Sequence, residues 1–430
     1  MEHQVKHYWL ETYGCQMNFA ESHALERDLL EHGFLPAQHP EEASVVVLNT
    51  CSVRKTAEDR IWGRLGYFKK MKQQHPLTVV LTGCMGERFI DQELSSYGVD
   101  VIIGTAGKNH IISYLTGTDE HFKTYEFQHS HYREGDLRSF VPIMNGCNNF
   151  CSYCIVPYVR GREVSRAPEE IYSEIDSLIQ KGVKEITLLG QNVNSYSYRD
   201  VGFLELLEEI ARRAEGSSWV RFMSSHPKDI SPELGDIMGS YSSLCSHIHL
   251  PVQHGADQVL SRMNRKYTRT HYLDMVQTLK QKVEGMTFST DLLIGFPGET
   301  EEDLLQTLEL IDIVGYTDAF TYYFNPREGT KAVGLADQLS HEVKLERLQR
   351  VIEAQRAISV REKEKRIGKI EMVLVEDRTK KDHNELLARS EHDDMVILPA
   401  SDAVVGEFTA VKLISLSGST FRGEVKRCGK

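Results

Sequence analysis

The sequence predicts an α/β protein in three parts: an N-terminal doubly wound parallel sheet, a central partial (β/α)6 barrel and a small C-terminal β-barrel. Two series of short apolar runs alternate with helical periodicity, over residues 1–125 and 138–366, which is typical of parallel strands joined by helices. After Gly368 the helical pattern stops, and short β-like runs separated by polar turns fill residues 367–430.

The first part contains four candidate strands, each a short run rich in Val, Leu, Ile or Thr. Helical periodicity separates them, most clearly over Glu21–His32 and Thr56–Gln74. Since strand and helix alternate, we expect parallel strands whose carboxyl ends lie at one edge of the sheet. The strands are predicted at His7–Thr12, Ser44–Asn49, Leu77–Thr82 and Val99–Ile103.

The second part contains six candidate strands with helical segments between them, fewer than the eight of a complete barrel. Thr300, followed three residues later by Asp303, predicts a helix that begins with a capping box. The charged run Ser340–Arg366 predicts one long helix. The barrel strands are predicted at Phe140–Met144, Glu185–Leu189, Val220–Ser224, His247–Pro251, Thr287–Ile294 and Ala319–Phe324, and those of the third part at Ile370–Val375, Met395–Leu398, Phe408–Ile414 and Phe421–Val425.

The composition bounds the class of protein. Hydrophobic residues make up 40% and charged residues 26% of the chain, the balance of a soluble globular protein. The longest apolar runs are too short to cross a membrane, and the N-terminus lacks an export signal, so we expect a cytoplasmic protein without a membrane partner. Eight cysteines in a reducing cytosol favour metal binding over disulfides. The net charge of −12 argues against a basic coat but allows a local RNA-binding patch.

The strongest local signal is the triplet Cys147, Cys151 and Cys154, spaced C-x3-C-x2-C. It directly follows the first predicted barrel strand and therefore lies at the barrel face where active sites are found. Three thiolates suit a 4Fe–4S cluster and leave one iron open for a ligand. A structural zinc site needs four closed ligands, and no fourth Cys or His lies within the motif or just after it. Zinc and a chance group of buried cysteines are the alternatives.

A second group of cysteines is dispersed along the first part. Cys15, Cys51 and Cys84 each follow a different predicted strand at its carboxyl end, and those ends converge on one crevice in a parallel sheet. Together they can hold a second cluster, although any one of them alone is more often a small buried hydrophobe. The remaining two have plainer interpretations, since Cys245 precedes a strand and Cys428 lies in the terminal tail.

Polar residues follow the later barrel strands and are candidates for a ligand pocket. Gly190 would let the backbone approach a ligand, although a simple βα turn explains the same residues. His226, His249 and His254 are also placed there, but hydrogen-bonded structural histidines are common. The candidate pocket residues are Gly190, Gln191 and Asn192 after the second strand, Ser224 at the end of the third and Gln253 after the fourth.

Four motifs resemble those of the radical-SAM methylthiotransferases, namely Tyr13–Asn18, Asn49–Arg54, Thr82–Arg88 and Gly146–Glu163. The C-terminal part resembles the TRAM RNA-binding domain of that family, so the resemblance covers nearly the whole chain. Gly-Cys-Gln-Met-Asn and Val-Pro-Tyr-Val-Arg-Gly-Arg-Glu are most similar to the MiaB branch, which makes 2-methylthio-N6-isopentenyladenosine beside the tRNA anticodon. The same chemistry on threonylcarbamoyl-adenosine or on a ribosomal protein aspartate is the near alternative.

The resemblance implies two 4Fe–4S clusters and S-adenosylmethionine (SAM) as cofactors. Cys147, Cys151 and Cys154 would hold the cluster that binds and cleaves SAM, and Cys15, Cys51 and Cys84 the auxiliary cluster that carries sulfur. Tyr153, Ile294 and Phe296 would lie near the SAM adenine. The target adenine C–H bond is too weakly acidic for a general base, so hydrogen-atom abstraction is the available route.

The implied partners are tRNA and an electron donor such as flavodoxin or ferredoxin, and we expect a monomer. Arginines near the active-site mouth can clamp phosphate or carboxylate groups, or can form plain ion pairs. The candidate RNA contacts are Arg160, Arg162, Lys380, Lys381 and Arg389. Ala388 stands where family members often have Gly. A non-catalytic RNA-binding protein with structural metal, and less so an electron-transfer protein, are the alternatives of another class.

Overall fold

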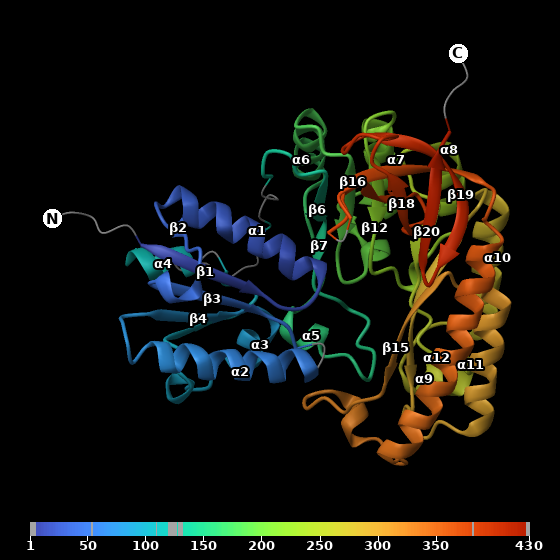
Figure 1. The fold of residues 1–430 in the computed structure, drawn as a ribbon. Helices are drawn as coiled ribbons and strands as arrows, with labels where there is room; N and C mark the ends of the chain where they lie inside the picture. Colours follow the sequence, from blue (N-terminus) through green and yellow to red (C-terminus); the bar gives the residue numbers. More distant parts are fainter. Residues whose placement is uncertain are drawn as a thin grey trace.

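The computed structural model describes residues 6–52, 55–108, 110–118, 127, 132–380 and 382–426. In Figure 1 the N-terminal sheet lies at the left, the large barrel at the right, and the C-terminal barrel at the upper right. The predicted Lys381 contact and the tail cysteine Cys428 lie outside the described residues. None of the described helices is both long enough and apolar enough to cross a lipid bilayer.

The N-terminal part is a parallel sheet with the strand order β2-β1-β3-β4-β5 and helices on both faces. Alternate strand residues explain the two layers, because Val46 and Leu48 pack on α2 while Val45 and Val47 pack on α1 and α4. The predicted doubly wound sheet is confirmed. Its elements are β1 His7–Thr12, α1 Gln16–Glu31, β2 Leu35–Pro36, β3 Val45–Thr50, α2 Lys55–Met71, β4 Thr78–Thr82, α3 Gly83–Arg88, β5 Val101–Ile103 and α4 His110–Thr116.

The central part is the predicted partial barrel. Its strands run parallel in two groups, β6-β9-β12 and β13-β14-β15, and a bridge from Val220 to Leu244 joins the groups. The strands are β6 Arg138–Pro142, β9 Glu185–Leu189, β12 Trp219–Phe222, β13 His247–His249, β14 Thr287–Ile294 and β15 Asp318–Tyr323. The helices are α6 Pro168–Gln180, α7 Phe203–Ala214, α8 Glu233–Ser240, α9 Asp257–Arg262, α10 Arg269–Lys282 and α11 Glu301–Val314.

Smaller elements complete the barrel. The hydroxyl of Thr300 accepts from the Asp303 amide, and the Asp303 carboxylate accepts from the Thr300 amide, which confirms the capping box. Ser340 caps α12, His341–Glu364, so the predicted long helix is also confirmed. The antiparallel pair of β7 Met144–Asn145 with β8 Val164–Ser165 was not predicted. The hairpin of β10 Ser197–Tyr198 with β11 Val201–Gly202 and the short helix α5, Val156–Val159, were not predicted either.

The C-terminal part is a closed barrel with the strand order β16-β17-β18-β20-β19 around a core that includes Val373 and Phe421. One strand, β17, was missed by the sequence analysis. Its charged ends Glu385 and Arg389 obscure an alternating pattern in which Leu386 and Ala388 point inward. The strands are β16 Ile370–Arg378, β17 Glu385–Ser390, β18 Met395–Pro399, β19 Phe408–Ser417 and β20 Thr420–Val425.

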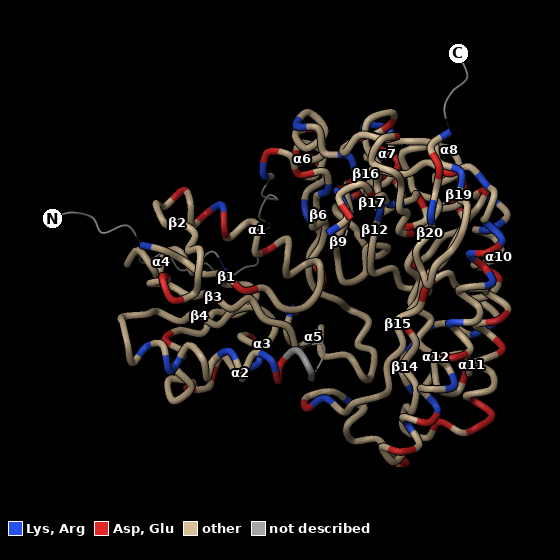
Figure 2. Tube along the Cα trace, viewed as in Figure 1, with Lys and Arg blue, Asp and Glu red and all other residues tan. Residues whose placement is uncertain are grey.

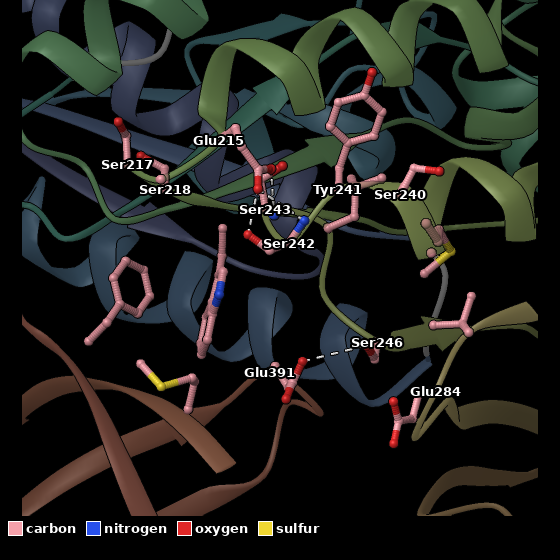
Figure 3. A pocket seen from close by; sticks show the side chains of 18 residues that line it. Glu215, Ser217, Ser218, Ser240, Tyr241, Ser242, Ser243, Ser246, Glu284 and Glu391 are labelled. Atoms are coloured by element: carbon pink, nitrogen blue, oxygen red, sulfur yellow. Dashed lines mark hydrogen bonds between the residues drawn. The ribbon is translucent and has the colours of Figure 1, made fainter. Parts of the chain in front are cut away.

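The C-terminal barrel docks at the end of the large barrel where the strands begin. The Arg221 guanidinium pairs with Glu185 at 2.8 Å and donates to the main-chain oxygens of Glu391 at 2.9 Å and Ser390 at 2.8 Å. A cavity of about 590 Å³ lies at this junction, and its lining includes Trp219 and Phe408, whose ring centroids lie 4.7 Å apart. Figure 3 shows the serines and glutamates around this cavity, including Ser246 beside Glu391.

A buried ion cluster fixes the end of α12 on the C-terminal barrel. Arg366 donates to Glu371 at 2.8 and 2.6 Å and also pairs with Asp394. We expect Arg366→Ala to lower the free energy of unfolding by about 3–5 kcal/mol, because buried Glu371 loses the guanidinium that pairs with it and buried Asp394 is left with Lys363. Chemical denaturation followed by circular dichroism measures this loss. As a control, Arg422→Ala removes an exposed pair with Glu385 and should cost under about 1 kcal/mol; equal losses would contradict the prediction.

Candidate functional site

Cys147, Cys151 and Cys154 lie in the loop between β7 and α5, beyond the carboxyl end of β6. Residues of other segments hold this loop. The Gly146 amide donates to Gln191 Oε1 at 2.5 Å, and the Asn264 side chain donates to the Phe150 oxygen at 2.9 Å. The three sulfurs are therefore presented by a fixed backbone at the mouth of the barrel.

The thiols of this loop sit in an environment that resists ionisation. Burial, together with the neighbouring Cys151, raises the pKa of Cys147 to about 11 and that of Cys154 to about 12. Metal ligands must be thiolates, so a group of buried cysteines this close together suits a positively charged metal centre. Among the described residues, no three Cys, His, Asp or Glu side chains converge on one metal ion. In a 4Fe–4S cluster each iron takes its own thiolate, so these donors fit the cluster without such convergence.

Cys15, Cys51 and Cys84 follow β1, β3 and β4. Two glycines bring their turns together. Gly14 has φ +118°, and a Cβ there would lie 2.5 Å from Cys51 Cβ. Gly83 has φ +86°, and a Cβ there would lie 2.3 Å from the Thr50 oxygen. Burial raises the pKa of Cys84, and Cys15 adds to that rise. Because β1, β3 and β4 are neighbouring parallel strands, the three sulfur donors follow their carboxyl ends at one edge of the sheet.

The two groups of cysteines lie on opposite sides of one interface between the N-terminal part and the barrel. Cys84 packs against Ile155 and Val159, which belong to the segment just after Cys154. The Thr105 hydroxyl, which follows β5, donates to the Val159 oxygen at 2.7 Å. Both cysteine groups are therefore anchored to the short helix α5.

A buried ion cluster crosses the same interface. Arg160 donates to both carboxylate oxygens of Glu21, at 2.8 and 3.2 Å, and Lys108 pairs with the same carboxylate. Burial alone would raise the pKa of Glu21, but the attraction of Arg160 and Lys108 outweighs it and lowers that pKa to about 2. The prediction that Arg160 contacts RNA is wrong, since its side chain is only 2% exposed and its charge is matched inside the protein.

The mouth of the barrel carries two residues in an unusual backbone conformation and several polar atoms without partners. Ser224 and Gln253, both predicted pocket residues, have φ +69° and +70°, a region that non-glycine residues rarely adopt. Buried polar atoms in proteins usually have a hydrogen-bond partner, so buried atoms at a strand end that lack one among the described residues indicate a site for a polar ligand. The orphaned atoms near the ends of β9 and β12 are Asn192 Oδ1, Asn194 Oδ1, Ser225 Oγ and His226 Nε2. This polar set fits the amino-acid and ribose groups of SAM.

Other predicted pocket residues have different surroundings. A Cβ on Gly190 would lie 2.5 Å from Met144 Cγ, so this glycine lets the end of β9 pack on β7 just before the cysteine loop, and the prediction that it approaches a ligand is not supported. Ile294 is fully buried in the barrel core. Phe296 is also fully buried and packs in a cluster with Phe324 and Tyr153.

The three candidate histidines divide into two kinds. His254 is completely buried and pairs with Glu299 at 3.1 Å, and His249 bonds the Ser289 hydroxyl at 3.0 Å, so both have structural partners. His226 accepts from the Lys228 amide through Nδ1, which leaves Nε2 as the protonated nitrogen. Burial and the nearby charge of Arg265 lower the pKa of His226, so this ring is neutral.

The predicted RNA contacts also differ from one another. Arg162 is exposed and lies over the Phe150 ring at 4.4 Å. Lys380 is exposed, and both signs of charge occur over the C-terminal barrel (Figure 2). Arg389 pairs with Glu376 and Asp393, each at 2.8 Å, so its charge is already matched and the prediction that it tracks a phosphate backbone is not supported.

Several residues of the site were missed by the sequence analysis. Glu21 lies 139 positions from Arg160, and no local pattern connects them. Ser225 and Asn194 follow the predicted strands, so polarity at a strand end was the available signal. Arg265 and Lys108 carried no signal, because they lie in connecting segments outside any motif.

We expect Glu21→Gln to destabilise the junction of the two cysteine groups, because Arg160 and Lys108 stay buried without their carboxylate. The loss should be about 3–5 kcal/mol in the free energy of unfolding, measured by chemical denaturation. Glu26→Gln is the matched control on the same helix, since Glu26 pairs with Arg133, whose side chain is 57% exposed. That variant should lose under about 1 kcal/mol, and a similar loss in both variants would refute the expectation.

Comparisons with known proteins agree with this geometry. Residues 141–311 match the radical SAM superfamily, and residues 7–104 match a family described as uncharacterized, UPF0004. The fold resembles the radical SAM methyltransferase TsrM from Kitasatospora setae, with a TM-score of 0.59 and 15% identity, over 77% of this chain and 74% of that one. OxsB, a cobalamin-dependent radical SAM enzyme, has a TM-score of 0.51 at 11% identity, over 81% of this chain and 56% of that one.

Closer relatives match along almost the whole chain. A tRNA-2-methylthio-N6-dimethylallyladenosine synthase from Treponema pallidum (strain Nichols) is 44% identical over 97% of this chain and 98% of its own length. A protein of the same name from Clostridium botulinum (strain Langeland) is 41% identical over 98% of this chain and 97% of its own length. The chain therefore belongs to the family of tRNA-2-methylthio-N6-dimethylallyladenosine synthases, within the radical SAM superfamily.

Proposed function

We propose that this protein adds a methylthio group at carbon 2 of N6-isopentenyl (dimethylallyl) adenosine beside the anticodon of tRNA. The observation that carries the proposal is the pair of three-cysteine groups that meet at α5, where Cys84 packs on the residues just after Cys154, next to a barrel mouth with orphaned polar atoms. An electron-transfer protein has no use for such a pocket. The names of the relatives favour the isopentenyl substrate over the threonylcarbamoyl and protein substrates.

We assign a role to each part of the chain. When bound, the cluster at Cys147, Cys151 and Cys154 supplies the electron that cleaves SAM, and the cluster at Cys15, Cys51 and Cys84 supplies the sulfur. The remaining residues position these groups. Gln191 fixes the backbone before Cys147. We assign Asn192, Ser224, Gln253 and Tyr153 to the lining of the SAM site, and the fully buried Ile294 and Phe296 to the packing that supports it. The parts are residues 1–125 for sulfur, 138–366 for SAM and 367–430 for RNA.

An aromatic and cationic surface on the cysteine loop supports RNA binding. Tyr158 is 47% exposed and meets the Phe150 ring edge-on at 5.9 Å, and Arg162 covers the same ring. Aromatic faces beside an arginine are the usual platform for unpaired bases. We therefore keep Arg162 and Lys380 as RNA contacts, with Lys381 as a further candidate. The protein would act as a cytoplasmic monomer that receives electrons from a flavodoxin or ferredoxin.

The proposal is tested on anaerobically purified protein with both clusters reconstituted. Incubation with dithionite, SAM and tRNA that carries isopentenyladenosine should give the 2-methylthio nucleoside, detected by mass spectrometry after digestion. Cleavage of SAM without this product would mean that the substrate is another one. Absence of both products at full iron loading would contradict the enzyme assignment.

Removing one group of cysteines should separate the two half-reactions. A Cys15→Ala, Cys51→Ala, Cys84→Ala variant should hold about four irons in place of about eight, because only one cluster remains. It should still cleave SAM but form no methylthio nucleoside. Cys147→Ala should abolish SAM cleavage. Iron assay and product analysis measure these outcomes, and methylthio product from either variant would contradict the assignment.

Loss of the exposed ring on α5 should weaken RNA binding. We expect Tyr158→Ala to weaken the binding of an anticodon stem-loop by about 1–3 kcal/mol in binding free energy, seen as a higher Kd, since a base loses its stacking partner. Fluorescence anisotropy measures this change, and SAM cleavage without RNA should stay at the wild-type rate. Tyr114→Ala is a control, because Tyr114 is also 47% exposed but lies on α4. Equal Kd values for both variants would exclude Tyr158 as a contact.

A further inference from the structure

We propose that Arg265 is a positioning residue for the cluster held by Cys147, Cys151 and Cys154, and that its N–H group and positive charge stabilise the reduced form of that cluster. The inference rests on the proposed function, since it requires a cluster at these cysteines. It assigns a role to a residue that lies outside the cysteine motif, in the segment between α9 and α10.

The geometry aims Arg265 at one cysteine. Its Nη1 donates to Cys151 Sγ at 3.5 Å, its Nη2 donates to the Pro251 oxygen at 2.8 Å, and its Nε donates to the Tyr267 hydroxyl at 2.9 Å. That hydroxyl in turn donates to the Val252 oxygen at 2.7 Å, so its lone pair faces the guanidinium. The Pro251 carbonyl and the Tyr267 hydroxyl therefore hold two of the guanidinium nitrogens. The third nitrogen, Nη1, is left directed at the Cys151 sulfur.

The charge of Arg265 lacks a matching carboxylate among the described residues. The residue is only 8% exposed, and its hydrogen-bond partners are a thiol, a carbonyl and a phenol. The aromatic groups beside it are Tyr267, which it covers at 5.1 Å, and the neutral His226. A buried cation is costly without a counter-charge. Cluster thiolates at Cys151 and its neighbours provide that negative charge.

This contact has a direct consequence for electron transfer. Reduction adds one electron to the cluster without making or breaking a bond, and the electron comes from the small redox protein proposed as donor. An N–H donor and a cation at the ligating sulfur stabilise the more negative, reduced state, because hydrogen bonds and net charge set cluster potentials. Arg265 therefore raises the reduction potential of this cluster.

The test is a potentiometric titration of the holoenzyme followed by electron paramagnetic resonance. The signal that changes when SAM is added identifies the cluster in question. At a fixed electrode potential, Arg265→Gln should lower the ratio of reduced to oxidised cluster about tenfold, a shift of about 59 mV for a one-electron couple. Arg265→Lys keeps the charge and should shift less. No tRNA is present, so the result does not depend on the substrate assignment.

Two controls make the outcome decisive. Arg269→Gln, which removes an arginine that pairs with Glu309 at 2.7 Å on the protein surface, should leave the potential unchanged. The second control uses wild-type enzyme produced with 15N-labelled arginine, so it does not depend on a variant that folds. Pulsed electron paramagnetic resonance of its reduced cluster should detect one coupled arginine nitrogen. An unshifted potential in Arg265→Gln with full iron content, or no arginine coupling in the wild type, would overturn the proposal. A shifted potential in Arg265→Gln would support the proposal even if the separate assay with tRNA gave no methylthio product, which would count against the proposed substrate alone.

Discussion

The buried carboxylate of Glu21 determines how the two halves of the active region meet. Glu21 lies on α1, the helix that begins directly after Cys15. Its carboxylate accepts from Arg160, which follows the other cysteine loop, and from Lys108, which follows β5. Burial of three charges is costly unless each is matched, so the network is stable only when the N-terminal sheet and the barrel are both in place. The packing of Cys84 on α5 depends on that arrangement.

Much of the fold follows from the sequence because its strands are local patterns. The barrel strands were placed within a few residues, and the capping box at Thr300 was recognised from two residue types at fixed spacing. Strand β17 was missed because charges at its ends mask the alternation, and β2 because two residues give no period. The pairing of β7 with β8 joins two-residue segments that are far apart in the sequence, and neither segment carries a residue pattern that predicts it.

The candidate site was only partly predictable. Cysteine spacing is a local property, so both groups of three were singled out, and strand ends indicated polar candidates for a pocket, such as Asn192 and Gln253. The environment of a long charged side chain is not local. Arg160 and Arg162 are two positions apart, yet one is buried in ion pairs and the other lies exposed on an aromatic ring. A third arginine, Arg265, is recognisable only once its distance to Cys151 is known.

The docking of the C-terminal barrel includes two contacts to main-chain atoms beside its side-chain contacts. Arg221 reaches the carbonyl oxygens of Ser390 and Glu391, which every amino acid carries, rather than their side chains. The turn after β17 can therefore change its residues during evolution while the arginine still finds the same acceptors. Selection would act on the shape of that turn, and the C-terminal barrel is left room to adapt its outer surface without losing its place on the large barrel.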